Sequence, residues 1–203
     1  MSALLKIEPE KTYTYEEYCT WQTGLDRYEL LDGVPYMMAA PNRAHQEVSM
    51  NLSGEIYALL KGRNCKVYAS PFDLRLQKKE DSKKKNDTVV QPDIFIVCQH
   101  NKKITPTKAG MDGAPDLVIE IISPSNSRHD RLRKFNQYAE AGVKEYWLVH
   151  PTDHTIEVYL LQDNDHYQIN EVYTRKDTIT ATVVEELAIE LSLVFEPEDV
   201  EYL

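Results

Sequence analysis

Two carboxylates stand beside or within apolar stretches of this sequence, and they are the residues best suited to chemistry. Asp93 precedes the apolar residues 94–97, and Glu120 lies in the middle of the apolar residues 117–122. A buried carboxylate costs several kcal/mol of stability unless a cation or hydrogen-bond donors compensate it. We therefore expect a positive charge between Asp93 and Glu120.

Carboxylates from two neighbouring strands form the kind of oxygen site that Mg²⁺ prefers, with water and substrate phosphate completing the octahedron. Such an ion polarises a phosphoryl oxygen and generates hydroxide from water. Alternation along a strand places Glu120 on the same face as Val118 and Ile122, so position 122 offers the site only a hydrocarbon. Any further polar group must come from a neighbouring element.

The hydrophobic pattern predicts the elements that position these residues. Strands are expected over residues 28–31, 35–38, 66–70, 72–76, 89–97, 117–122, 145–149, 155–161 and 167–173, and helices over residues 44–60 and 125–142 and from residue 14 toward 24. Residues 100–115 are expected to form a polar connection. Strand, helix and strand over residues 117–149 predict a parallel crossover, whereas the hairpins predict antiparallel pairing. The predicted fold class is α/β, with a mixed sheet flanked by helices.

The predicted helix over residues 125–142 has two distinct faces. Its apolar face consists of Leu132, Phe135 and Ala139, and its polar stripe of Asp130, Lys134 and Tyr138. The members of the stripe are one helical turn apart, so a crossover helix could aim them at the end of the Glu120 strand. On a solvated face, the same stripe would be only an ion pair worth ~0.3–0.5 kcal/mol beside a packed tyrosine.

Length and composition indicate one soluble domain. The chain has 203 residues, of which 42% are hydrophobic, so we expect a single domain over residues 1–203 with its core at about 26–175. It has neither an apolar run of ~18 residues, as a membrane span needs, nor the apolar segment of a signal peptide at its start. We expect a cytoplasmic protein that does not enter the membrane. Cys19, Cys65 and Cys98 form no paired motif, so we expect packed, reduced thiols rather than a disulfide or a zinc site.

The net charge of −10 argues against a protein that coats nucleic acid by bulk electrostatics, because phosphate binding depends on Lys and Arg. It does not exclude a nucleic-acid enzyme. Acidic residues at a metal site and basic residues on one face are compatible with a negative average. The lysine-rich residues 78–85 are expected to form a solvated loop or, alternatively, a clamp on DNA phosphates.

Pro92-Asp93, followed by Glu120 after 120 − 93 = 27 residues, resembles the PD-(D/E)XK nuclease superfamily. In that superfamily the Asp and the Glu bind Mg²⁺, and a Lys assists the attacking water. Ile122 stands at the position of this Lys. Over most of its length the chain is similar to one branch of the superfamily, the restriction-endonuclease family of unsettled biological role. The shared motifs are YELLDG at 28–33, PNRAH at 41–45, PD at 92–93, EIISPS at 120–125, and residues 130–149, which end in EYWLV.

This resemblance implies a restriction-endonuclease-like fold and a Mg²⁺-dependent DNA endonuclease, with Mn²⁺ as a substitute ion. Asp93, Glu120 and the backbone carbonyl of Ile121 would bind the metal. In this branch the lysine is thought to have moved to the following helix, where Lys134 matches it and would be the catalytic lysine. The resemblance implies no other cofactor, and cleavage of both DNA strands would suit a homodimer.

Four further residues are expected to support this site. The resemblance places Glu29 near it as an acidic or metal-associated group, and His45 as a phosphate contact or proton carrier. Asp130 and Tyr138 belong to the polar stripe that contains Lys134.

The same residues have other interpretations. Asp93 could be a turn residue after a proline, and Glu120 could be paired with a Lys or Arg that holds the core without a metal. The fold could be an inactive module that binds DNA or a protein, act on RNA or nucleotides, or be purely structural. An ion between Asp93 and Glu120, within reach of Lys134, would favour the enzyme. A salt bridge filling that place would favour the other interpretations.

Overall fold

The computed structural model of the protein describes residues 7–8, 11–21, 27–77, 87–101, 103–107, 110–123 and 128–196, with the backbone alone for residues 128–130. Its helices are α1 (Tyr15–Cys19), α2 (Arg43–Leu60), α3 (Arg128–Ala141) and the short 3₁₀ helix η1 (Leu191–Leu193). Its strands are β1 (Tyr28–Leu31), β2 (Val34–Met37), β3 (Cys65–Ala69), β4 (Asp73–Leu76), β5 (Thr88–Val90), β6 (Ile94–Cys98), β7 (Ile104–Pro106), β8 (Gly110–Gly113), β9 (Leu117–Ile121), β10 (Glu145–His150), β11 (Thr155–Leu161), β12 (Tyr167–Thr174), β13 (Thr178–Thr180) and β14 (Ala188–Glu190).

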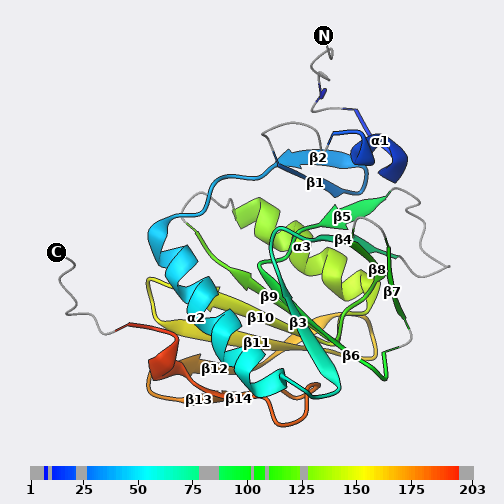
Figure 1. Ribbon diagram of the computed structural model, residues 1–203. Helices are drawn as coiled ribbons and strands as arrows, with labels where there is room; N and C mark the ends of the chain where they lie inside the picture. Colours follow the sequence, from blue (N-terminus) through cyan, green and yellow to red (C-terminus); the bar gives the residue numbers. More distant parts are fainter. Residues whose placement is uncertain are drawn as a thin grey trace.

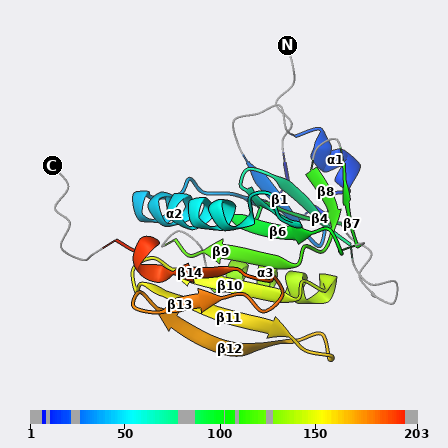
Figure 2. The same ribbon diagram turned by 60° about the horizontal axis from the view of Figure 1, so that its bottom comes forward.

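The strands form two larger sheets and one small hairpin. The first sheet has the order β2-β1-β5-β4-β8-β7 and the second β12-β11-β10-β9-β6-β3, while β13 pairs with β14. Strands β9 and β10 are parallel, as are β4 and β8, whereas neighbours such as β6 and β9 are antiparallel. Figure 2 shows the second sheet as a stack that runs from β6 to β12. The predicted α/β class with mixed strand directions is confirmed, and so is the parallel crossover through α3.

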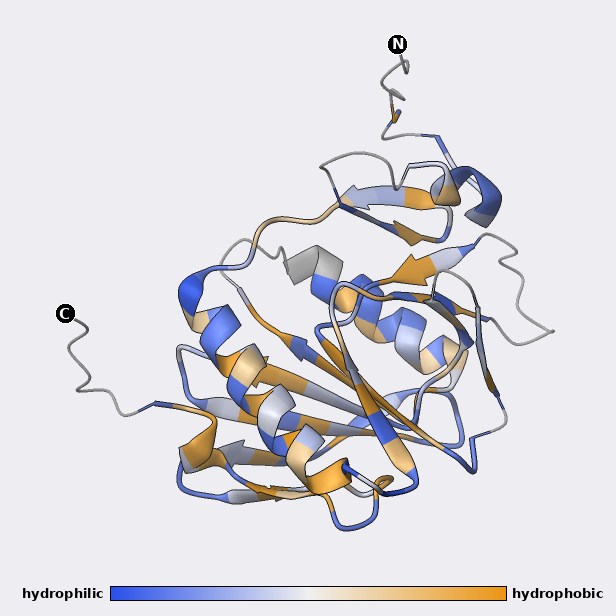
Figure 3. Ribbon diagram, viewed as in Figure 1, coloured by the Kyte–Doolittle hydropathy of each residue, from blue (hydrophilic) through white to orange (hydrophobic). Residues whose placement is uncertain are grey.

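Helix α2 covers one face of the second sheet, and α3 lies on the other face (Figure 1). The Asn42 side chain starts α2 by accepting a hydrogen bond from the His45 N–H at 2.9 Å. The buried, sheet-facing residues of α2 are Val48, Leu52, Ile56 and Leu60. Figure 3 shows hydrophobic and hydrophilic residues alternating along this helix, which is typical of a helix with one buried side.

Alternation along β6 and β9 gives the second sheet two different faces. Ile96 and Ile119 pack with α2, whereas Phe95 and Val118 pack on the side of α3. Glu120 contacts Tyr138 and Lys134 of α3, so its side chain lies on the same face as Val118. This is the orientation that the two-residue period of a strand predicts. The crossover helix and the acidic strand therefore face each other.

The strand predicted over residues 89–97 is wrong as a single element. It is divided into β5, which belongs to the first sheet, and β6, which belongs to the second. The break falls at residues 91–93, where Pro92 has no N–H to donate to a strand partner. The chain passes from one sheet to the other at this point.

The polar connection predicted over residues 100–115 in fact contains two strands, β7 and β8. Their sequences do not indicate strands, because β8 begins and ends with glycine and β7 ends with proline, and both residue types are depleted in strands. A Cβ atom at Gly110 would clash with the backbone of Asp73, so glycine is needed for the close approach of β8 to β4.

The prediction of packed, reduced cysteines is also wrong. Cys65 and Cys98 form a disulfide, and Cys19 is free and exposed. The two bonded residues lie directly opposite each other in the antiparallel pair of β3 and β6. Their separation of 33 residues in the sequence does not indicate this proximity.

The apolar face predicted for α3 is partly wrong. Leu132 is 52% exposed, whereas Tyr138 and Ala139 are buried and Phe135 is partly buried. The helix turns Lys134 and Tyr138 toward the sheet, because carboxylates there compensate the charge of the lysine.

The other predicted elements are confirmed with small shifts at their ends, except that α1 ends at Cys19. Residues 22–26, the lysine-rich residues 78–85 and residues 124–127, where α3 was expected to begin, lie outside the described residues. In the part of the chain that the structure describes, no helix has both the length and the apolar character needed to cross a bilayer.

Two leucines on different helices test the division between buried and exposed faces. Leu52 on α2 is completely buried, and Leu132 on α3 is 52% exposed. We expect Leu52→Ala to lower the free energy of unfolding by about 2–5 kcal/mol, because it removes buried methyl groups and leaves a cavity. Leu132→Ala should change it by less than about 0.5 kcal/mol. Urea denaturation followed by circular dichroism measures both, and equal losses would contradict the observed orientation of α3.

Candidate active site

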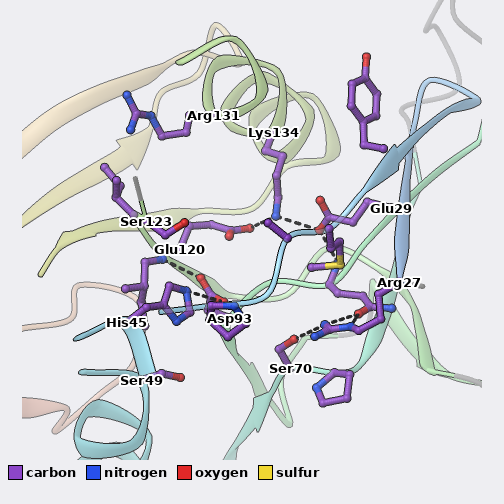
Figure 4. Close-up of a pocket in the computed structure, with 18 of the residues that line it drawn as sticks. Arg27, Glu29, His45, Ser49, Ser70, Asp93, Glu120, Ser123, Arg131 and Lys134 are labelled. Atoms are coloured by element: carbon purple, nitrogen blue, oxygen red, sulfur yellow. Dashed lines mark hydrogen bonds and ion pairs between the residues drawn. The ribbon is translucent and has the colours of Figure 1, made fainter. Parts of the chain in front are cut away.

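Asp93 and Glu120 come together because their strands are paired. Strands β6 and β9 are antiparallel with Ile94 opposite Ile119, so Asp93, just before Ile94, lies beside Glu120, just after Ile119. Oδ2 of Asp93 accepts a hydrogen bond from the Ile121 N–H at 2.8 Å, which fixes this carboxylate against the end of β9. Both acidic residues line a pocket with a volume of about 340 Å³ (Figure 4).

His45 lies at the other oxygen of Asp93. Its Nε2 is 3.2 Å from Asp93 Oδ1, and its side chain is largely buried. Burial lowers the pKa of His45, but the hydrogen bond and the charge of Asp93 outweigh burial and raise it above its usual value. The first turn of α2 therefore brings to the pocket an imidazole that protonates readily.

Lys134 is the centre of a second charged group. Its ammonium lies 2.7 Å from Glu120 Oε1 and 2.9 Å from Glu29 Oε1. The Tyr138 hydroxyl, one turn further along α3, donates a hydrogen bond to the same Glu120 oxygen at 2.6 Å. Burial opposes the charge on Lys134, but the two carboxylates outweigh it and raise the pKa of the ammonium above its usual value. The lysine is therefore protonated at neutral pH.

Glu29 belongs to β1 of the first sheet and is buried, with 6% of its surface exposed. Its Oε1 accepts a hydrogen bond from the Gln91 N–H at 2.8 Å and another from the Lys134 ammonium. Glu29 is thus a fixed acceptor for the lysine, and the first sheet contributes directly to the site.

Three carboxylates of the pocket, Glu29, Asp93 and Glu120, pair with only two of its basic groups, Lys134 and His45. Burial raises the pKa of Glu120 to about 7, and the charges of Asp93 and Glu29 act in the same direction, while Lys134 acts against them. A hard divalent cation would relieve this excess of negative charge. The oxygen donors of Asp93, Glu120 and the Ile121 carbonyl are of the type that Mg²⁺ binds. Among the described residues, no three acidic, histidine or cysteine side chains are arranged as a metal site, so water and substrate would have to complete the coordination.

Most of the residues predicted for the site gather around this pocket. They are Glu29, His45, Asp93, Glu120, Ile121, Lys134 and Tyr138. Ile122 also lines the pocket, while the ammonium of Lys134 reaches Glu120 from α3. The side chain of Asp130 lies outside the described residues. Within the described part of the chain, the ion pairs of Lys134 go to Glu120 and Glu29, and none goes to Asp93. The chemical role of each residue stays a prediction.

The pocket also contains polar residues to which the sequence analysis gave no role in the site. Among them are Arg27, Ser70, Gln91, Ser123 and Arg131. Arg27 stands two positions before Glu29, and Gln91 two positions before Asp93. Residues two apart in an extended segment share a face, and this spacing could have predicted that both lie at the site. Arg131 stands one turn before Lys134 on α3.

A comparison with protein-family models matches residues 14–193 to the family described as "Uma2: Putative restriction endonuclease". The chain belongs to the Uma2 family. The matched span contains every pocket residue named above, so the family assignment and the pocket concern the same part of the molecule.

Two curated relatives and one solved structure are similar to this chain. It is 31% identical to "Uncharacterized protein slr1290" of Synechocystis sp. over 157 aligned residues, and this alignment covers 76% of this chain and 77% of that protein. It is 22% identical over 191 residues to "Uncharacterized protein sll1609" of the same organism, with coverages of 93% and 98%. The crystal structure of "a putative nuclease" from Anabaena variabilis matches it with a TM-score of 0.71 at 19% identity, covering 90% of this chain and 97% of that one. The predicted nuclease-like fold is confirmed by this structural similarity.

Removal of Lys134 tests the charge balance of the pocket. We expect Lys134→Met to lower the free energy of unfolding at about pH 8 by about 3–5 kcal/mol, because it leaves buried carboxylates without a cation. The loss should shrink toward about pH 5, since Glu120 has a raised pKa and is protonated there in the folded state. Urea denaturation at both pH values measures the change.

Lys61→Met is the matched control, because Lys61 is exposed just after α2. A loss for Lys134→Met no larger than for this control would contradict a buried ion pair.

Proposed function

We propose that the protein is a metal-dependent endonuclease that hydrolyses phosphodiester bonds in DNA. The observation that supports this most strongly is the position of Asp93 beside Glu120, in a pocket that the Lys134 ammonium enters from the following helix. Membership of a family described as restriction endonucleases points to the same chemistry.

In this proposal Asp93, Glu120 and the carbonyl of Ile121 would hold Mg²⁺ or Mn²⁺. Bound there, the ion polarises a phosphoryl oxygen and lowers the pKa of the attacking water. The protein itself keeps these oxygens in place. The Ile121 N–H holds Asp93, and the Tyr138 hydroxyl holds Glu120, as hydrogen bonds around ligands do in other metal sites.

Lys134 orients the attacking water and stabilises negative charge on the phosphate. Its raised pKa keeps the ammonium protonated, so it acts as a hydrogen-bond donor and not as a base. Glu29 retains the ammonium in the pocket when Glu120 takes part in the metal site. His45, beside Asp93, is placed to contact a phosphate oxygen or to carry a proton.

A second candidate is an inactive module of the same fold that binds DNA or a protein. Two observations favour it: Ile122 stands at the position of the motif lysine, and Lys134 already supplies a positive charge to Glu120. RNA or a nucleotide would suit the same groups as DNA. For duplex DNA, a homodimer would supply one pocket for each strand.

Cleavage of a supercoiled plasmid tests the proposal. The wild-type protein should cut the plasmid with Mg²⁺ or Mn²⁺, and EDTA should prevent cutting. Asp93→Ala and Lys134→Ala should each lower the rate at least about 100-fold, because each removes a group that acts at the reacting phosphate. Asp153→Ala, at an exposed turn, is the matched control and should cut like the wild type. Cleavage that survives in Asp93→Ala would defeat this mechanism, and a wild type that cuts with neither metal would favour the inactive module.

The rate of cleavage should also depend on pH through Glu120. Burial raises the pKa of this carboxyl to about 7, and a proton on it prevents metal binding. At low metal concentration the rate should rise up to about tenfold per pH unit toward pH 7 and level off above it. Excess metal should move the midpoint to lower pH. A rate that stays constant between about pH 5.5 and 8.5 would argue against Glu120 as a ligand.

A further inference from the structure

Arg27 enters the pocket next to the acidic residues but pairs with none of them. Its Nε and Nη2 donate hydrogen bonds to Gln91 Oε1 at 3.0 and 2.5 Å, and Nη2 donates a third to Ser70 Oγ at 2.7 Å (Figure 4). Both acceptors are neutral groups. Among the described residues, no carboxylate lies within ion-pair distance of Arg27, and its hydrogen-bond partners leave its positive charge uncompensated there.

Arg27 differs in this respect from the other charged groups of the pocket. Asp93 is paired with His45, and Glu29 with Lys134, while Arg27 is held rigidly by an amide and a hydroxyl. An arginine side chain has five N–H donors. Three of them are used here, and the two on Nη1 have no partner among the described residues. A guanidinium that is fixed in place and keeps free donors loses little entropy when it binds an anion.

Arg131 supplies a second cation on the other side of the pocket. It lies one turn before Lys134 on α3, and it makes no hydrogen bond or ion pair with another described residue. Figure 4 shows Arg27 and Arg131 on opposite sides of Asp93 and Glu120. The pocket therefore has an acidic centre between two arginines that form no ion pair within the described part of the chain.

We propose that Arg27 and Arg131 bind two phosphates of one nucleic-acid strand, on either side of the phosphate that lies at Asp93 and Glu120. This inference rests on the proposed function and adds the path of the substrate backbone. Guanidinium groups suit phosphates because their paired N–H donors match two phosphate oxygens. Two phosphate contacts in the pocket also allow a chain with a net charge of −10 to hold a polyanion locally.

Gln91 is the positioning residue of this arrangement. Its side-chain oxygen holds Arg27, and its backbone N–H holds Glu29 at 2.8 Å. Its Nε2 donates to Asp73 Oδ1 at 2.8 Å, which fixes the amide plane. Gln91 therefore fixes the position of Arg27, the proposed phosphate contact, relative to Glu29, which accepts a hydrogen bond from Lys134.

Binding of a fluorescent oligonucleotide, as a duplex and as a single strand, tests this inference by anisotropy in EDTA, where no metal-dependent cleavage occurs. Arg27→Met should weaken binding about tenfold, because it removes one charge-assisted contact. It should also reduce the slope of log Kd against log salt by about 1. Arg131→Met should have a similar effect, and the double variant should reduce the slope by about 2. Arg63→Met is the charge-matched control, because Arg63 lies outside the pocket and pairs with Glu186.

Arg27→Lys separates phosphate binding from a merely structural role. A lysine cannot bridge Gln91 and Ser70, but it keeps the positive charge. Phosphate binding predicts that Arg27→Lys retains the wild-type salt slope, whereas a structural role predicts that it behaves like Arg27→Met. All affinities are measured well below the melting temperature of each variant.

Unchanged affinity and salt slope in Arg27→Met would overturn the inference, as would an equal loss in Arg63→Met or no binding by the wild type. The cleavage assay gives an independent result. Binding that depends on Arg27 in a protein that never cuts DNA would support the phosphate contacts and defeat the nuclease.

Discussion

The ammonium of Lys134, shared by Glu29 and Glu120, is the interaction on which the arrangement of this protein depends. Two carboxylates on different sheets could not be buried side by side without a cation, because each costs several kcal/mol when desolvated alone. The lysine comes from the crossover helix and lies within hydrogen-bond distance of both. It thereby fixes the rotation of α3, so that Leu132 points to solvent and Tyr138 to the core.

The site lies where the two sheets meet, and Pro92 makes this meeting possible. The chain leaves the first sheet after β5 and enters the second at β6. Gln91 and Asp93 are two residues apart, but Gln91 binds a residue of the first sheet and Asp93 a residue of the second. Gln91 holds Glu29, while Asp93 holds the end of β9 through the Ile121 N–H. A continuous strand would have kept Gln91 and Asp93 in one sheet and, because they are two residues apart, on the same face.

If the proposed function holds, the charges of the pocket account for phosphate binding by an acidic protein. Bulk electrostatics is unfavourable at a net charge of −10. What matters at short range is whether each pocket charge is already paired. Asp93, Glu29 and Glu120 each have a cationic neighbour, whereas the partners of Arg27 in the described part of the chain, Gln91 and Ser70, are neutral. In the proposed function, a phosphodiester would therefore meet the charge of Arg27 at the edge of the pocket and carboxylates paired with His45 and Lys134 at its centre.

The sequence by itself determined the acid pair, the parallel crossover and the α/β class, because these follow from local patterns: apolar runs with a period of two, helical spacing and turn residues. It also placed Lys134 and Tyr138 on one stripe. Only the tertiary structure decided which face of α3 is buried, that residues 89–97 belong to two sheets, that Cys65 bonds to Cys98, and that Arg27 lies in the pocket. These features depend on contacts between residues that are distant in the chain. Strand register and charge compensation select such contacts, and neither leaves a periodic signal in the sequence.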